Sequence, residues 1–180
     1  RYRVPNKNQC KECHSTNDVI SPIGPKARNL DKNLTYGSET KNQLAYLLQK
    51  GVIDSIPLNF QTVSDWEDES QSLEDRARAY LAINCGHCHT PSGVANSTGL
   101  YLDFNEVRPL HLGINKSPVA TGRGSGNLNY SIVPGKAHES ILLFRMISTD
   151  PGVMMPESGR SLVHVEASNL IEEWINSMDN

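Results

Sequence analysis

The sequence predicts an all-α fold in which a few helices are joined by long irregular loops. Four segments space their apolar or capping residues as helices do, namely 42–52, 72–84, 139–147 and 165–178. The stretch 91–135 is rich in Gly, Pro, Asn and Ser and contains no long periodic segment. We therefore expect loops there, with at most a short hairpin.

The first predicted helix spans 42–52 and ends between Gly51 and Pro57. Its apolar face consists of Leu44, Leu47, Leu48 and Val52. Only nine residues precede Cys10, which is too few for a full helix at the start of the chain.

The other three helices are predicted in the second part of the chain. Ser72 and Asp75 give the helix over 72–84 a capping-box pattern, and this helix leads directly into Cys85. A short helix follows over 139–147. The last helix, over 165–178, has one apolar face made of Leu170, Ile171, Trp174, Ile175 and Met178.

All four cysteines lie in two copies of the pattern Cys-x-x-Cys-His, at 10–14 and 85–89. This pattern is the signature for covalent attachment of a c-type haem. Each cysteine adds across a haem vinyl group as a thioether, and the histidine that follows binds the iron. The expected cofactors are therefore two haem c groups. The attachment residues are Cys10, Cys13, Cys85 and Cys88, and the proximal iron ligands are His14 and His89.

Two other uses of the cysteines remain open, with less support. A structural zinc site uses Cys and His at similar spacing, but it gathers four ligands into one compact knot, whereas these two pairs lie far apart in sequence. Two disulfides fit an exported protein. A bridge within Cys-x-x-Cys is, however, typical of a thioredoxin-like βαβ setting, and no βαβ pattern surrounds either pair.

The composition of the chain argues against two classes of protein, those that bind nucleic acid and those that span a membrane. The 180 residues carry a net charge of −3 and are 37% apolar, which is lean for a globular chain. The charges are mixed and form no basic stripe, which argues against nucleic acid as a partner. No apolar run approaches the ~20 residues that span a bilayer. Arg1 is not an initiator residue, so we expect a mature protein or an excised domain.

The chain divides into two modules, one around each motif. We expect a first module over 1–64, a second over 72–180, and an acidic, solvated connector over 65–71. The connector contains Trp66, which can pack on either module.

The second module resembles a class I cytochrome c domain. The resemblance rests on the helix 72–84 before the motif, on the segment 132–140, and on Met155-Pro156 before the final helix. The whole chain is also similar to an uncharacterised bacterial family with both haem motifs, and to cytochrome c domains of large bacterial surface proteins. By this resemblance Met155 is the distal ligand of the second haem, where a soft thioether favours reduced iron. In the other interpretation, Met154 and Met155 both fill the core.

The first module resembles the same fold only in part. Pro25 lies eleven residues after His14. There the family places a proline whose carbonyl accepts the second N–H of the proximal histidine. Lys26, Arg28 and Asn29 then either approach a haem propionate or lie at the surface.

The first module has no methionine where the family has its distal ligand, since Ile56 stands before Pro57 and no methionine precedes Met146. The first haem then takes a ligand from the second module, takes a local group such as Lys26, or keeps an open site. Candidates in the second module are Met146 or His164, which we prefer, and Met154, His111 and His138. His87, inside the second motif, is expected to be exposed.

These observations predict a di-haem c-type cytochrome domain that transfers electrons, an electron carrier rather than an enzyme. Covalent haem attachment of this kind takes place outside the bacterial cytoplasm, so we expect a periplasmic or cell-surface location. The expected partner is a redox protein or an attached oxidoreductase domain, such as the sugar-dehydrogenase-like domains found in some members of the similar family. The alternative is a di-haem peroxidase-like enzyme with an open first haem, although those enzymes are longer. A redox or gas sensor is a third possibility.

Overall fold

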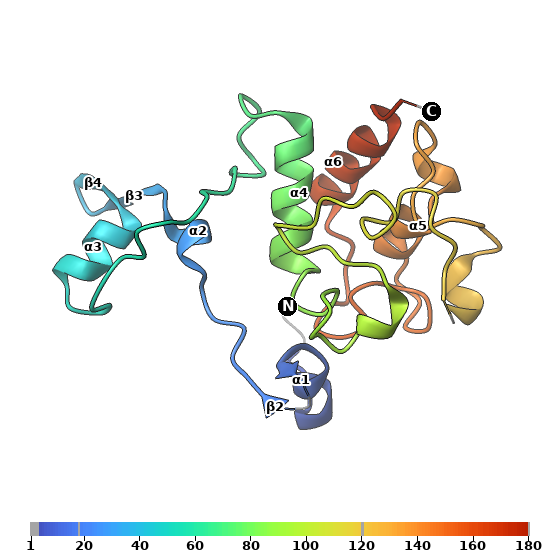
Figure 1. Ribbon diagram of the computed structural model, residues 1–180, viewed down its shortest axis with the longest axis horizontal. Helices are drawn as coiled ribbons and strands as arrows, with labels where there is room; N and C mark the ends of the chain where they lie inside the picture. Colours follow the sequence, from blue (N-terminus) through green and yellow to red (C-terminus); the bar gives the residue numbers. More distant parts are fainter. Residues whose placement is uncertain (1–3, 18, 120, 180) are drawn as a thin grey trace.

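The computed structural model describes residues 4–17, 19–119 and 121–179 (Figure 1). Its compact part contains α4 (Leu73–Asn84), α5 (Ile141–Ile147) and α6 (Val165–Asn176). Loops with the 3-10 segments η1 (Asn96–Thr98), η2 (Gly122–Ser125) and η3 (Ala137–Glu139) join these helices. The N-terminal part extends along one side. It contains α1 (Lys7–Cys13), β1 (Ser15–Thr16), β2 (Val19–Ile20), α2 (Ala27–Leu30), β3 (Asn33–Tyr36), β4 (Glu39–Asn42) and α3 (Gln43–Gln49).

The prediction of an all-α fold is wrong. Only 34% of the structure is helical, and the N-terminal part contains the antiparallel pairs β1–β2 and β3–β4. Tyr36 lies opposite Glu39, so only Gly37 and Ser38 form the turn between β3 and β4. Gly37 has a φ of +67°, and a two-residue turn that begins with glycine matches the twist of a hairpin. The described residues within 91–135 form the expected loops, with turns, 3-10 segments and single bridges and without a hairpin.

The four predicted helices are confirmed, with shifts of a few residues at their ends. α3 begins after Asn42, whose side chain accepts the N–H of Ala45. α4 begins after Ser72, whose Oγ accepts the N–H of Asp75 at 3.1 Å and donates to its carboxylate at 2.7 Å. This pairing satisfies one of the free N–H groups at the start of the helix. α5 and α6 lie within their predicted ranges.

The helix α1 is an element that the sequence pattern does not predict. Its seven residues include both cysteines of the first motif. The side chain of Asn6 accepts the N–H groups of Asn8 and Gln9, both at 3.0 Å. The Gln9 side chain in turn accepts the N–H of Asn6 at 3.1 Å. This capping box lets a helix begin close to the chain start.

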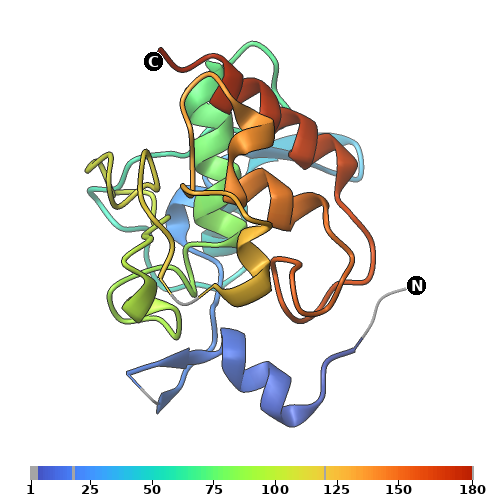
Figure 2. The same ribbon diagram turned by 90° about the vertical axis from the view of Figure 1, so that its right-hand side faces the viewer.

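The apolar core lies where α4 packs on α6, with α5 and η3 against the other side of α6 (Figures 1 and 2). Its most buried large side chains are Leu81, Ile132, Leu143, Ile171 and Ile175. Trp66 packs against this core and contacts the Tyr80 ring edge-on, with centroids 5.6 Å apart. The connector tryptophan therefore packs on the second module.

The N-terminal part has little core of its own. Leu44 is the one buried apolar side chain among the described residues before Ser72. Leu48 and Val52, which the helical pattern places on the same face, are exposed. Polar contacts join this part to the compact part, such as Arg28 Nη2 to Asp103 Oδ1 at 3.3 Å. Across the described residues, every helix is too short or too polar to span a lipid bilayer.

Candidate metal centre at the two Cys-x-x-Cys-His turns

Both motifs fold as a single helical turn closed by the same backbone hydrogen bond. The N–H of His14 donates to the carbonyl of Cys10 at 2.9 Å, and the N–H of His89 donates to the carbonyl of Cys85 at 2.9 Å. This bond joins residues four apart, which is the spacing of an α-helical turn. The first turn ends α1 and the second follows α4.

The second turn lies tightly against its surroundings. A Cβ at Gly86 would stand 2.8 Å from the carbonyl oxygen of Ala82 and 2.9 Å from that of Leu102. Both distances are shorter than a carbon–oxygen contact allows, and both neighbours are backbone atoms that cannot swing away. The glycine in Cys-Gly-His-Cys-His therefore lets this turn approach the chain that follows it.

The His89 ring is held by a main-chain carbonyl. Its Nδ1 lies 3.3 Å from the carbonyl oxygen of Leu100. A carbonyl can only accept, so Nδ1 carries the proton and Nε2 keeps its lone pair. Burial is the main cause that lowers the pKa of His89, which keeps the ring neutral at pH 7. A neutral, oriented imidazole with a free Nε2 is the form that binds a metal ion.

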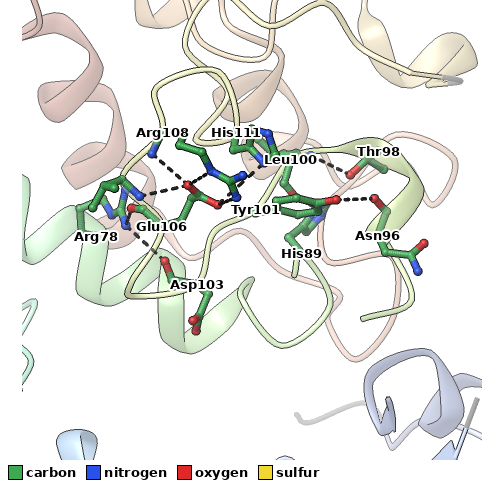
Figure 3. A network of polar contacts seen from close by, with 11 residues as sticks. Arg78, His89, Asn96, Thr98, Leu100, Tyr101, Asp103, Glu106, Arg108 and His111 are labelled. Atoms are coloured by element: carbon green, nitrogen blue, oxygen red, sulfur yellow. Dashed lines mark hydrogen bonds and ion pairs between the residues drawn. The ribbon is translucent and has the colours of Figure 1, made fainter. Parts of the chain in front are cut away.

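The loop that carries Leu100 is fixed on both sides (Figure 3). The N–H of Leu102 donates to the carbonyl of His89 at 2.8 Å, and the N–H of Tyr101 donates to that of His111 at 2.7 Å. The hydroxyl of Thr98 accepts the N–H of Leu100 at 3.2 Å. The carbonyl that orients the His89 ring thus belongs to a hydrogen-bonded segment.

A second group of contacts holds the same loop against α4 (Figure 3). Arg78 Nη2 donates to the carbonyls of Asp103 and Glu106, at 3.2 and 2.6 Å. The Glu106 carboxylate accepts Nε and Nη2 of Arg108, at 2.8 and 2.5 Å. The hydrogen bond from Arg108 is the largest cause that lowers the pKa of Glu106 to about 2.

Leu100 is a site residue that the sequence analysis misses. It acts through its carbonyl, so its side chain gives no signal. The signal that exists is the separation of eleven residues from His89, equal to that between His14 and Pro25. In the described residues, no hydrogen bond joins the His14 ring to Pro25.

Lys26 and Arg28 lie beside the second motif. Their side chains reach Asp103 at 3.8 and 3.3 Å. Together with Gly24 and Asn29 they line one side of a small cleft of about 100 Å³, which Ile83 and His87 line on the other. This cleft is thus built from both modules.

The three predicted distal-ligand residues lie in the second module. Met155 is half-buried, and its N–H donates to the carbonyl of Arg145 at 3.0 Å. Met146 is buried in the core, at 8% exposure. His164 Nδ1 lies 3.1 Å from the Tyr80 hydroxyl. Met146 and His164 are both engaged inside the second module.

The structure brings one cysteine from each motif together. The ligand atoms of Cys13, His87 and Cys88 all lie within 4.8 Å of one another. His87 is half-buried rather than exposed as predicted, and its Nδ1 is buried without a hydrogen-bond partner in the described structure. These three residues form a Cys-His-Cys group that can hold a metal ion or lie against a haem.

The pKa values of the two thiols in this group are shifted in opposite directions. The hydrogen bond from Cys88 is the largest cause that lowers the pKa of Cys13 to about 4, and the same bond raises the pKa of Cys88. The thiol of Cys88 donates to the carbonyl of Glu12, 3.3 Å from its Sγ. Cys85 differs, because burial raises the pKa of its thiol to about 12.

Comparison with known protein families, with curated proteins and with solved structures finds no match to this chain.

Proposed function

We propose that this chain is a di-haem c-type cytochrome domain that transfers electrons between redox partners in the periplasm or at the cell surface of a bacterium. The observation that carries the proposal is the arrangement at the second motif. His89 lies in a closed Cys-x-x-Cys-His turn, half-buried and neutral, with Nδ1 opposite the Leu100 carbonyl and Nε2 free to bind iron.

The residues of the second motif fit a covalently bound haem. Cys85, Cys88 and His89 belong to one backbone turn, so two sulfurs and one imidazole are presented from the same short segment. Bound haem supplies a one-electron change between Fe(III) and Fe(II). The chain attaches the cofactor through both sulfurs, orients the imidazole through Leu100 and limits water around it.

Met155 is the distal ligand of the second haem in this proposal. Its loop is held by two hydrogen bonds with Arg145, whose carbonyl accepts the N–H of Met155 at 3.0 Å and whose Nε donates to the carbonyl of Val153 at 2.8 Å. Met154 is buried at 4% exposure, whereas Met155 is half-buried. This difference supports core packing for Met154 and ligation by Met155.

The first haem is attached through Cys10 and Cys13, with His14 as its proximal ligand. Pro25 and Arg28 lie in the segment that follows, and Arg28 borders the cleft beside the second motif. The same cationic segment offers charge for a propionate.

Whether the iron of the first haem has a distal ligand distinguishes an electron carrier from a peroxidase-like enzyme. Ligation by Met146 or His164 requires the side chain to leave its present contacts, the core for Met146 and the Tyr80 hydroxyl for His164. Because both side chains already have partners in the second module, the second candidate is a peroxidase-like enzyme with an open first haem. A carrier needs both irons six-coordinate, whereas an enzyme needs one open position.

The partner follows from the same proposal. An electron carrier docks transiently through a small surface near a haem edge. The net charge of −3 favours a basic or neutral partner. A separate redox protein and an attached oxidoreductase domain both satisfy this requirement.

The test is the chain matured in a host that attaches haem. Pyridine haemochrome absorbance and intact mass should show two haems per chain. Two low-spin ferric signals in the electron paramagnetic resonance spectrum support the carrier. One high-spin signal that shifts on adding cyanide supports the peroxidase-like enzyme. A colourless chain with the mass of its amino acids alone overturns both.

A further inference from the structure

The cytochrome proposal does not explain why Cys13, His87 and Cys88 lie close together. His87 has no role as an attachment site or as a proximal ligand, yet its Nδ1 is buried with no hydrogen-bond partner in the described residues. A buried imidazole nitrogen without a partner is costly, so its neighbours matter. The His87 ring lies beside the sulfurs of Cys13 and Cys88, and one ligand atom from each of the three residues lies within 4.8 Å of the other two.

The group is formed by two segments that other contacts hold together. Cys13 is the last residue of α1, and His87 and Cys88 follow α4. The N–H of Asn17 donates to the carbonyl of Ser92 at 3.2 Å. The hydroxyl of Ser158 donates to the carboxylate of Glu12. α1 lies below α4 in both ribbon views (Figures 1 and 2), so its C-terminal end reaches the second motif.

The donor set selects the kind of ion. Two sulfurs and one imidazole nitrogen exclude calcium and magnesium, which take oxygen ligands. Zinc takes cysteine sulfur at about 2.3 Å and histidine nitrogen at about 2.0 Å, so ligand atoms on tetrahedral zinc lie about 3.5 Å apart. The atoms of this group need to approach by about 1 Å, which side-chain rotation provides. Zinc also accepts three protein ligands with water as the fourth.

We propose that, before haem is attached, Cys13, His87 and Cys88 bind one zinc ion. The site joins the two motifs, so it fixes α1 against the compact part in the chain that awaits haem. The proposal goes beyond the cytochrome function, because a cysteine converted to a thioether has lost the thiol proton and can no longer form a thiolate ligand.

The experiment uses the full chain produced without haem attachment, reduced and freed of metal. Co²⁺ is titrated first, because its sulfur charge-transfer and visible bands report tetrahedral thiolate ligation, and Zn²⁺ then displaces it. The expected result is one ion per chain. Cys13→Ser, Cys88→Ser and His87→Ala should each weaken binding by at least about tenfold.

Matched controls are present in the same motifs. Cys10→Ser and Cys85→Ser also leave three thiols in the chain, but both residues lie outside the Cys-His-Cys group. These two variants should bind zinc as the parent does. If they lose affinity as strongly as Cys13→Ser and Cys88→Ser, each Cys-x-x-Cys pair binds on its own and the proposal is overturned. Circular dichroism without metal identifies any variant that fails to fold, and His87→Ala, which keeps all four thiols, then decides alone.

A second arm uses the chain with two haems attached. Its thioethers should leave no site of the parent affinity for Zn²⁺. Equal affinity in both forms would show that the ion is bound elsewhere and would overturn the proposal. Should no haem be attached at all, the cytochrome proposal fails while the titration of the metal-free chain still decides the zinc site.

Discussion

His87 and His89 are separated by one residue, yet their rings have different surroundings. The Nδ1 of His89 lies 3.3 Å from the Leu100 carbonyl, which fixes the tautomer that leaves Nε2 free. The Nδ1 of His87 has no hydrogen-bond partner in the described residues, and the His87 ring lies beside two sulfurs. A main-chain carbonyl thus holds the His89 ring, whereas the His87 ring belongs to the Cys-His-Cys group.

Gly86→Ala tests how tightly the second turn is packed. The new Cβ would stand 2.8 and 2.9 Å from two backbone oxygens, so the turn must shift. We expect a loss of about 1–3 kcal/mol in the free energy of unfolding, measured with urea. Haem occupancy of the second motif should fall while that of the first is kept. Unchanged stability and occupancy would show that the turn has room.

Met155→Ala tests the distal ligand of the second haem. We expect the weak long-wavelength band of sulfur bound to ferric iron to disappear from the absorption spectrum. Met154→Ala is the control. It should cost about 2–5 kcal/mol of stability, because Met154 is buried, and it should keep the band. The opposite pattern would assign ligation to Met154.

At the scale of elements, the site depends on the start of α4 and on the loop after the second motif. α4 leads into Cys85 and is capped by Ser72. The loop 96–111 returns to the His89 ring and is tied to α4 through Arg78. A single substitution tests each of these two elements, at Ser72 for α4 and at Glu106 for the loop.

Ser72→Ala removes the side-chain cap of α4. Because Ser72 Oγ accepts the N–H of Asp75, its loss should lower the free energy of unfolding by about 1 kcal/mol. Ser72→Gly, which is better tolerated at this position, should cost only a few tenths of a kcal/mol. Chemical denaturation measures both. A Ser72→Ala variant as stable as the parent would mean that the side-chain hydrogen bond contributes nothing.

Glu106→Gln tests the loop contact through its pH dependence. The pKa of Glu106 is lowered from 4.5 to about 2 in the folded chain, mainly by Arg108. The ionised carboxylate therefore stabilises the fold above pH 4.5, and this contribution is lost as the pH falls toward 2. We expect the variant to be less stable than the parent at pH 7 and equal to it near pH 2. Thermal melts across this range measure the difference.

The matched control is Glu139→Gln, which changes an exposed carboxylate paired with Lys136. It should leave the melting temperature close to that of the parent at every pH. A difference between Glu106→Gln and the parent that persists at low pH would contradict the assignment to the ionised carboxylate.

At the scale of the molecule, the compact part has an apolar core of its own, whereas the N-terminal part has almost no apolar core. The core lies between α4 and α6, whereas Leu44 is the one buried apolar residue among the described residues before Ser72. The first motif is nevertheless placed beside the second, through Glu12 and Cys88. A large apolar cofactor would supply what the first part lacks.

The capping and periodic patterns of the sequence are enough to predict α3, α4, α5 and α6. They are not enough for β3 and β4, since these strands are short and polar and none of their residues is buried, so alternation does not stand out. The meeting of Cys13 with Cys88 also has no sequence signal, because it depends on how two distant segments dock. The residue type at Leu100 gives no signal either, since every residue carries a backbone carbonyl, and only the spacing of eleven residues from His89 points to it.

Replacing Cys10 and Cys13 together by Ala tests whether the first motif carries its own haem. The intact mass should fall by one haem relative to the parent, and the second haem should remain. The first part should become easier to cleave with protease, because it loses the apolar body that it packs against. A parent and variant with equal haem content would show that the first motif binds none.

Covalent attachment of two haems to this chain is decided by intact mass spectrometry of the matured, denatured protein. We expect the mass of the 180 residues plus two haems, retained after acid extraction because thioether bonds resist it. A mass equal to that of the polypeptide alone would show that neither motif carries haem.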